Sequence, residues 1–280
     1  MFSSKLFLRK SLRRLLLQPW FYRSYQLTLL HLSEFFRIQR ATALEQAAGE
    51  TLDRLSPEKK VVSGPFAGMV YPEHSAFGSS FPPKLIGSYE HELHAVIEPL
   101  LSNKYSKIID IGCAEGYYAV GFALRFPLSE VLAFDPSPCA RSLCCDMARI
   151  NGVAKRVQPE GFCDPATLTK LTKGETCLIL CDCEGYEEWL FPQFIIPSLG
   201  HSTLIIETHD FVSPTITKQL KDGFLDSHVC TEIVPGDPEA RLEKFRATLS
   251  SATSKDWLIR HLLDEGRPLT QCWLIFTPRT

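Results

Sequence analysis

The feature that most constrains the fold is a regular alternation of short apolar runs and amphipathic stretches, which begins at Lys107. Each apolar run contains β-branched residues and predicts a buried strand, and each stretch that follows has the spacing of a helix. In order, the runs read KIIDIG, EVLAFD, a weaker RVQPEGF, CLILCD and TLIIET. Repeated strand-then-helix units predict a mostly parallel sheet with helices on both faces and right-handed crossovers. We therefore expect an α/β fold with a Rossmann-like, doubly wound sheet.

The whole chain divides into three predicted parts. Residues 1–60 would form a basic, helical arm, because apolar residues recur at helical spacing from about Leu27 to Leu55. Residues 61–100 would form a lid and the helix that leads into the sheet. Residues 101–280 would form the sheet domain, which is the part expected to carry the chemistry.

The predicted lid and the carboxyl-terminal segment depart from simple alternation. Residues 61–83 are rich in Gly, Pro, Ser and aromatic residues, a composition that indicates short strands and turns. Ser88 is expected to cap a helix whose first turn contains Glu90 and Glu92. Near the end of the chain, HVCTEIV and QCWLIFTP read as strands, with helical material between them.

The first twenty residues, MFSSKLFLRKSLRRLLLQPW, combine basic residues with leucines at helical spacing. A basic amphipathic helix can lie on an anionic membrane surface, and packing against the chain's own second helix is the alternative. The segment lacks the cleavage site of a signal peptide, and no apolar run approaches the roughly 20 residues of a membrane span. We expect a cytoplasmic protein, with peripheral membrane contact through this segment left open.

Charge and cysteine content exclude two classes of protein. A formal net charge of −2 gives the chain no long-range field that would gather nucleic acid, so we expect no nucleic-acid partner. Ten cysteines in a chain of 280 residues read as reduced core residues rather than as a disulfide framework. The sequence does not indicate an oligomeric state.

The first chemical motif is KIIDIGCAEGYY, in which a strand delivers Asp110 and the chain turns at Gly112. Gly116 opens the next helix, and glycines here would let the turn bring its backbone amides against a ligand. A dinucleotide loop also contains glycines, but it needs G-x-G-x-x-G, and Ala114 replaces the middle glycine. Glu115 would place a carboxylate at the helix start, where a diphosphate normally binds. The motif therefore favours a zwitterionic amino-acid ligand.

The second motif is VLAFDPSP, which ends the second predicted strand at Asp135. An acid at this separation from the first glycine meets the ribose hydroxyls of a bound nucleoside, with charge-assisted hydrogen bonds. Capping of the next helix is the alternative role. Any cofactor that contains adenosine could bind through this acid. Asp135 therefore predicts a nucleoside pocket but does not identify the ligand.

The third motif, CDCEGYE, follows the fourth predicted strand. Together, IDIGCAEGYY, AFDPSP, CDCEGYEEWLF and IIETHD resemble the FkbM-type family of class I, S-adenosylmethionine-dependent methyltransferases, whose fourth strand ends in D-x-E-G-x-E. The resemblance covers about Ile108 to Phe211. It implies a seven-stranded sheet in which QCWLIFTP is inserted antiparallel.

The same resemblance implies S-adenosyl-L-methionine as the cofactor. The implied contacts come from the segments that follow the first four strands: Asp110, Gly112, Cys113, Ala114, Gly116, Asp135, Pro136, Phe162 and Asp182. In the family pattern the first of these segments holds the methionine end, Asp135 the ribose and Phe162 the adenine, while Asp182 lies near the transferring methyl group. Family members often have Asn where Glu115 stands, so a ligand contact of that residue is left open.

Four polar residues would lie at or just beyond the carboxyl ends of neighbouring strands, where open α/β sheets bind ligands: Asp182, Glu184, Glu207 and His209. We predict that they are catalytic. A hydroxyl acceptor must lose its proton, and we expect His209 to be the base, oriented by Asp182 or Glu207. Alternatively, Glu207 and His209 only satisfy loop groups. A metal held by Asp182, Glu207 and His209 would suit these ligand types, but we predict that the site has none.

The sequence therefore predicts a methyltransferase of EC class 2.1.1 that methylates a hydroxyl of a small molecule or a saccharide. Two alternatives stay open. One is an NAD-dependent oxidoreductase, which Ala114 and the absence of a Tyr-x-x-x-Lys pair disfavour. The other is a catalytically inactive protein of the same fold that binds a membrane surface or a partner through its basic arm.

Overall fold

The computed structural model describes residues 19–267 and 271–279. By its internal contacts, the chain forms two compact units, Met1–Gly49 and Glu50–Thr280. The basic segment before Pro19, for which we expect a membrane-surface helix, lies outside the described residues.

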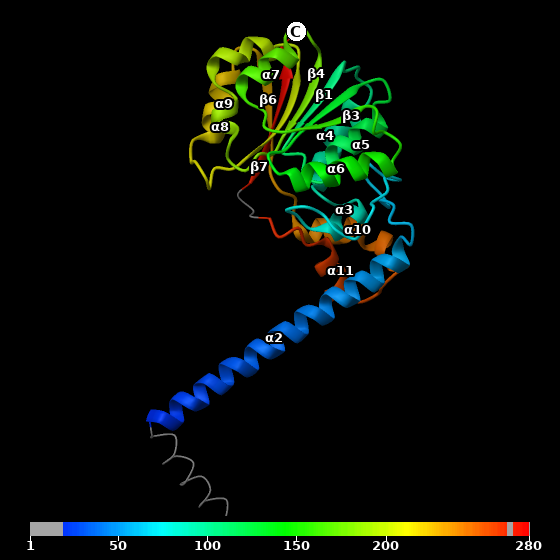
Figure 1. Ribbon diagram of the computed structural model, residues 1–280, viewed down its shortest axis with the longest axis vertical. Helices are drawn as coiled ribbons and strands as arrows, with labels where there is room; N and C mark the ends of the chain where they lie inside the picture. Colours follow the sequence, from blue (N-terminus) through cyan, green and yellow to red (C-terminus); the bar gives the residue numbers. More distant parts are fainter. Residues whose placement is uncertain (1–18, 268–270, 280) are drawn as a thin grey trace, which may run out of the picture. The chain divides into compact units, whose positions relative to one another are not determined.

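The second unit is built on a seven-stranded sheet with the order β3-β2-β1-β4-β5-β7-β6 (Figure 1). The strands are β1 (Lys107–Ile111), β2 (Glu130–Phe134), β3 (Val157–Glu160), β4 (Cys177–Cys181), β5 (Thr203–Thr208), β6 (His228–Ile233) and β7 (Cys272–Pro278). Only β7 runs antiparallel to its neighbours, β5 and β6. The predicted Rossmann-like, mostly parallel sheet with an inserted antiparallel strand is confirmed.

Helices cover both faces of this sheet and one of its edges. The helices of this unit are α3 (Phe81–Ile86), η1 (His91–Leu93), α4 (His94–Leu100), α5 (Tyr117–Arg125), α6 (Pro138–Ile150), α7 (Pro165–Thr172), α8 (Glu187–Leu190), η2 (Gln193–Leu199), α9 (Ile216–Phe224), α10 (Pro238–Ser250) and α11 (Asp256–Leu263). Apolar residues of α7, α8, η2 and α9 pack on one face, whereas α5 contacts β1 and β2 from the other (Figure 1). All five residues of β4 are buried, as expected of a central parallel strand.

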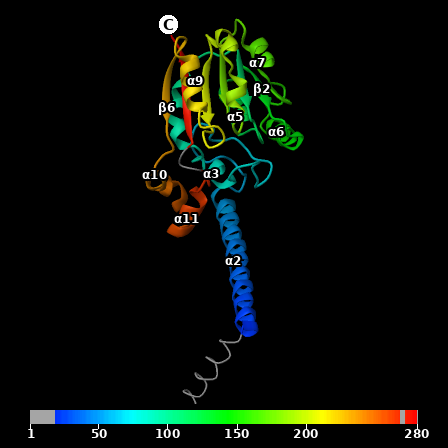
Figure 2. The same ribbon diagram turned by 90° about the vertical axis from the view of Figure 1, so that its left-hand side faces the viewer.

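Beyond the carboxyl ends of the parallel strands lie α3, α10 and α11 (Figure 2). The predicted turn-rich segment before α3 contains one isolated antiparallel bridge, Lys60 to Val70, and no long helix. The helix predicted to start at Ser88 begins instead at His91, and Ser88 does not cap it. Glu90 precedes that helix with a left-handed φ of 46° and is buried, so its carboxylate faces the interior of the protein.

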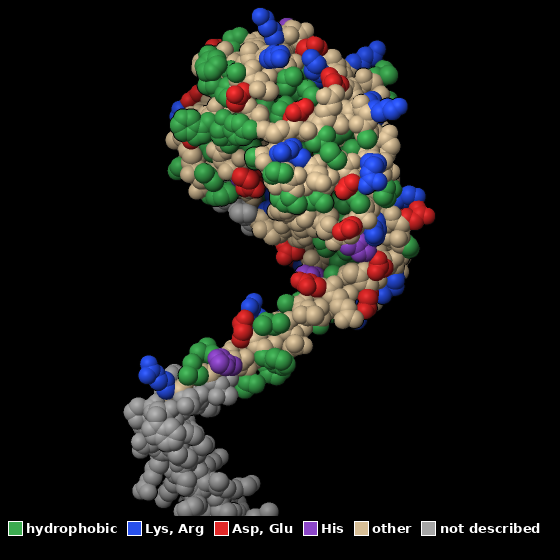
Figure 3. Space-filling view, in the orientation of Figure 1, with side chains coloured by type: hydrophobic (Ala, Val, Ile, Leu, Met, Phe, Trp, Pro, Cys, Tyr) green, Lys and Arg blue, Asp and Glu red, His purple; other side chains and the backbone are tan. Residues whose placement is uncertain are grey.

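The first unit is formed by α2 (Pro19–Leu55) up to Gly49, which confirms the predicted helical arm. Figure 3 shows apolar side chains at the surface along this helix. The large exposed ones include Leu27, Leu30, Leu32, Phe35, Phe36 and Ile38. Of the helices in the described residues, none has the length and apolar character needed to cross a membrane.

The residues that follow β1 and β4 lie against each other, backbone to backbone. Ile111 stands opposite Phe134 of β2 and Cys181 of β4, so the next residue of each strand emerges at the same edge of the sheet. Gly112 has a left-handed φ of 89°, and a Cβ there would lie 1.7 Å from the carbonyl oxygen of Asp182. Only glycine fits, because both the backbone angle and the neighbouring strand exclude a side chain.

Gly112→Ala should lower the free energy of unfolding by about 3 kcal/mol or more, because it combines a strained φ with a backbone collision. The matched control is Gly161→Ala, where a Cβ meets nothing within 4 Å and the change should stay within about 1 kcal/mol. Urea unfolding of both variants measures the difference. Equal stabilities would show that the two strands separate more easily than this packing implies.

Candidate active site

A cavity of about 680 Å³ opens at the carboxyl ends of β1, β2 and β4. This volume falls within the range of small-molecule sites, and the position is the switch point at which open α/β sheets bind ligands. Most of the predicted site residues line it: Gly112, Cys113, Ala114, Asp135, Pro136, Phe162, Asp182, Glu184 and Glu207. Asp110, Gly116 and His209 are buried behind this lining.

The turn after β1 has a different internal structure from the one we expected. The amides of Gly112 and Cys113 both donate to the carbonyl of Phe134, at 2.8 and 3.0 Å, and the Ala114 amide donates to Asp135. These amides are therefore not free for a ligand, and that part of the prediction is wrong. Gly116 is required by packing, since a Cβ there would lie 2.8 Å from Sγ of Cys144 in α6.

Asp135 directly follows β2 and lies on the cavity wall. One carboxylate oxygen accepts the Ala114 amide at 3.1 Å, and the other accepts the Ser137 amide at 2.8 Å. Two backbone donors fix the carboxylate, yet each oxygen keeps a second lone pair. Capping of α6 falls to Ser137, whose hydroxyl accepts from Ala140. Asp135 is therefore held rigidly and can accept two further hydrogen bonds from a ligand.

Aromatic rings form much of the remaining wall. Phe162 is 57% exposed and packs its ring against Tyr186 with a centroid separation of 4.9 Å. Tyr89 and Tyr117 line another part of the cavity, with their rings edge to face. Such faces accept a planar base or a cationic group.

Glu115 does not face the ligand space. It is buried, and its carboxylate is bound by Lys84 at 2.6 Å, by the Phe77 amide at 3.1 Å and by the Tyr71 hydroxyl at 3.3 Å. The interaction ties the segment before α3 to the start of α5. Because Lys84 neutralises this carboxylate, Glu115 gives no reason to exclude a diphosphate, contrary to our expectation from the sequence.

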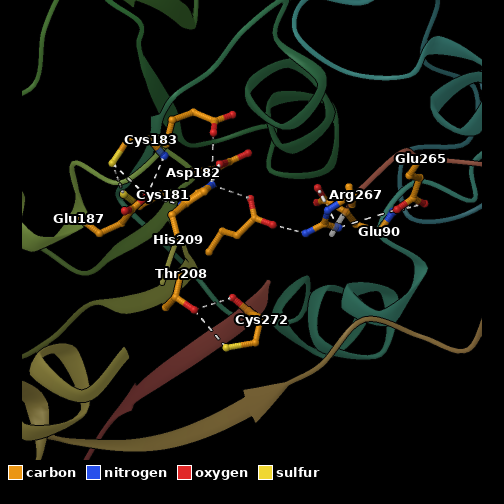
Figure 4. A network of polar contacts seen from close by, with 12 residues as sticks. Glu90, Cys181, Asp182, Cys183, Glu187, Thr208, His209, Glu265, Arg267 and Cys272 are labelled. Atoms are coloured by element: carbon orange, nitrogen blue, oxygen red, sulfur yellow. Dashed lines mark hydrogen bonds and ion pairs between the residues drawn. The ribbon is translucent and has the colours of Figure 1, made fainter. Parts of the chain in front are cut away.

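His209 connects the predicted catalytic residues (Figure 4). Its side chain is 0% exposed, and its Nδ1 lies 2.9 Å from the equally buried carboxylate of Glu187. Its Nε2 lies 3.5 Å from Asp182, 3.6 Å from Glu184 and 3.6 Å from Glu207. Burial lowers the pKa of His209, but the hydrogen bond and charge of Glu187 raise it, and the net direction is upward. The role of His209 as base stays a prediction, and its burial favours an indirect role.

Arg267 forms the other side of the same network. Its guanidinium pairs with Glu207, Glu90 and Glu265, so several buried carboxylates share one cation (Figure 4). Burial, together with the charges of Asp182 and Glu90, raises the pKa of Glu207 to about 11 against the lowering effect of Arg267. Burial likewise raises the pKa of Glu265 to about 8. The site therefore holds protons that exposed carboxylates would release.

Several members of this network were not predicted from the sequence. Glu187 is the last acid of the CDCEGYE motif, so its position was available as a signal. Arg267 and Lys84 carried no local signal, because each meets its partners only through long-range folding. Glu90 was expected in the first turn of a helix and instead reaches Arg267.

Two cysteines lie at the end of β4. Cys181 is its last residue, and the sulfur of Cys183 lies 3.5 Å from that of Cys181. Both are free thiols. The Cys183 amide donates to Glu187 at 3.1 Å, which helps to fix the carboxylate that holds His209.

Comparisons with known proteins return solved structures alone. The chain matches no protein-family model, and the curated proteins give no match. A human methyltransferase 10 domain containing protein is 13% identical, with a TM-score of 0.46 over 84% of this chain and 97% of that chain. Geranyl diphosphate C-methyltransferase from Streptomyces coelicolor A3(2) is 14% identical, with a TM-score of 0.40 over 78% and 86%.

Precorrin 8w decarboxylase from Methanobacterium thermoautotrophicum is 19% identical, with a TM-score of 0.42 over 66% of this chain and 89% of that chain. At such low TM-scores, these similarities carry no inference about ligand or activity. The order and direction of the strands themselves identify the fold.

Asp110 is buried behind the cavity, and the protonation state of its carboxyl group can be tested. Neither carboxylate oxygen has a hydrogen-bond partner among the described residues, and burial raises its pKa from 3.8 to about 8. Between these values the folded chain keeps a proton that the unfolded chain has lost. The contribution of Asp110 to the free energy of unfolding therefore falls as pH rises, by up to about 1.4 kcal/mol per pH unit.

Asp110→Asn should remove this dependence, so the variant should gain stability relative to the wild type between about pH 5 and pH 8. Urea unfolding at both pH values measures the gain. Asp164→Asn is the control, because hydrogen bonds from Thr167 lower the pKa of Asp164, which stays ionised over this range. A difference for Asp110→Asn that is independent of pH would contradict the buried, protonated state.

Proposed function

We propose that this protein is an S-adenosylmethionine-dependent methyltransferase of the FkbM type that methylates a hydroxyl of a small molecule or a saccharide. The observation that carries the proposal is the position of Asp135 and Asp182 on one cavity, after strands on either side of β1. A nucleoside held through its ribose at Asp135 would extend across the end of β1. Its reactive group would then lie near Asp182.

The charges around the cavity favour a sulfonium over a diphosphate. Of the described residues that line it, five are acidic: Asp135, Asp182, Glu184, Glu207 and Glu265. The two basic residues of the same lining, Lys84 and Arg267, are already paired with carboxylates. Glu207 and Glu265 have raised pKa values and pair with Arg267, so the remaining negative charge comes from Asp135, Asp182 and Glu184. A positively charged sulfonium gains from these carboxylates and from nearby aromatic faces, whereas a diphosphate would be repelled.

The adenine would lie against Phe162, which is exposed to the cavity and supported by Tyr186. The ribose hydroxyls would donate to the free lone pairs of Asp135. This arrangement agrees with the roles that the sequence resemblance implies. It differs in the methionine portion, because the amides of Gly112, Cys113 and Ala114 are occupied within the protein.

Methyl transfer needs an acceptor oxygen in line with the carbon–sulfur bond. As the oxygen bonds to the methyl carbon, the carbon–sulfur bond breaks and the sulfur leaves as a neutral thioether. Asp182 faces the cavity with a side chain that is 27% exposed, so we assign it to receive the hydroxyl proton. His209 lies behind Asp182 with its buried Nε2 3.5 Å from the carboxylate, so it acts on Asp182 through charge and not through a hydrogen bond. Most of the rate would come from holding the acceptor at attack distance.

Calorimetry tests the cofactor directly. S-adenosylhomocysteine should bind the wild-type chain, and NAD should not. Asp135→Asn should weaken binding by about ten- to a hundredfold, because a charged hydrogen bond contributes about 1.5 to 3 kcal/mol. The control is Asp222→Asn, an exposed position in α9 that pairs with Lys218. Binding of NAD alone would support the oxidoreductase, and binding of neither compound would support the inactive alternative.

Asp182→Asn separates chemistry from cofactor binding. The amide cannot accept the proton, so methylation of an accepted substrate should slow by roughly a hundredfold. Affinity for S-adenosylhomocysteine should change little. Transfer of a deuterated methyl group to a panel of saccharides and phenols, followed by mass spectrometry, measures the rate. Full activity in this variant would remove Asp182 from proton transfer.

A further inference from the structure

His209 presents a buried nitrogen without a partner. The residue is 0% exposed, and Nε2 has no hydrogen-bond partner among the described residues. Around it, carboxylate oxygens of Asp182, Glu184 and Glu207 lie at 3.5 to 3.6 Å, beyond hydrogen-bond distance. Oδ1 of Asp182 is also buried, and no described residue forms a hydrogen bond with it. Several carboxylate oxygens therefore converge on Nε2 without forming a hydrogen bond with it.

The opposite side of the imidazole is fixed by a carboxylate. Nδ1 lies 2.9 Å from Glu187, which is itself 0% exposed and is held by the Cys183 amide. A histidine that binds a metal usually donates its second ring N–H to a carboxylate or a carbonyl group. When Nδ1–H donates to Glu187, the lone pair of Nε2 points at the converging carboxylates.

We propose that Asp182, Glu207 and His209 bind a divalent cation of the Mn²⁺ type at the base of the cavity. One ligand atom from each residue lies within 4.8 Å of the others. Ligand atoms around a shared ion lie about 3.0 Å apart in an octahedral site and about 3.4 Å apart in a tetrahedral one. The observed separations of 3.5 and 3.6 Å from Nε2 need to close by only a few tenths of an ångström.

The types of ligand atom and the nearby charge of Arg267 indicate which class of ion would bind. Two carboxylates with one imidazole suit a divalent metal of the first transition row, and Mn²⁺ accepts both ligand types. Arg267 compensates one oxygen of Glu207, and the other faces His209. An ion can enter from the cavity, because Asp182 and Glu207 both line it. Metal binding at this point does not depend on the proposed methyl transfer.

A second explanation for the cluster is a protonated imidazole that balances the carboxylates without any metal. Equilibrium dialysis of the full chain against Mn²⁺ alone, followed by elemental analysis, distinguishes the two. The metal site predicts about one Mn²⁺ per chain and a melting temperature that rises with Mn²⁺ concentration. A protonated imidazole predicts no saturable binding below about 1 mM, and that result would overturn the proposal.

Variants locate the site. Asp182→Asn and Glu207→Gln should each weaken Mn²⁺ binding by about a hundredfold or more, and Glu187→Gln should weaken it by about ten- to a hundredfold through the imidazole. The matched control is His228→Gln, a buried histidine whose two ring nitrogens already contact Ser227 and Ser202. Melting curves without metal confirm that each variant folds. Mn²⁺ binding that persists in both carboxylate variants would place the ion elsewhere and refute the site.

Discussion

Parallel pairing of β1 with both β2 and β4 determines where every polar group of the site lies. Because the three strands end in register, the residue after each one emerges at the same edge of the sheet. Asp135 and Asp182 reach one cavity for this reason, although 47 positions separate them in the chain. The close approach at Gly112 maintains that geometry, since any side chain there would push β4 away. The absence of a side chain at Gly112 thus fixes the separation between Asp135 and Asp182, which a bound ligand must span.

The second organising factor is the cost of burying carboxylates. Burial raises the pKa of Glu207, Glu265 and Asp110. These carboxyl groups therefore keep a proton where the fold supplies too few positively charged partners. Arg267 is the cation that Glu207 and Glu265 share, and His209 lies 3.6 Å from Glu207. A surplus of buried acid is expensive for stability, but it suits a site that receives a sulfonium, a hydroxyl proton or a divalent ion.

Sequence patterns predicted most of the sheet because each strand is a local apolar run with a local turn. They also predicted Asp135, since its place depends only on the end of β2. Local patterns could not reveal the partners of Glu115 or Arg267, because Lys84 and the acids around Arg267 come from distant segments. Gly112 was identified correctly but for another reason: its role is to let two strands meet, whereas we expected its amide to face a ligand.

The most direct measurement is a crystal structure of the chain with S-adenosylhomocysteine. We predict that the ribose hydroxyls lie within hydrogen-bond distance of Asp135, that the adenine packs on Phe162, and that the sulfur faces Asp182 across the end of β1. A ligand bound away from this edge of the sheet, or a cavity that stays closed to it at saturating concentration, would contradict the proposed function.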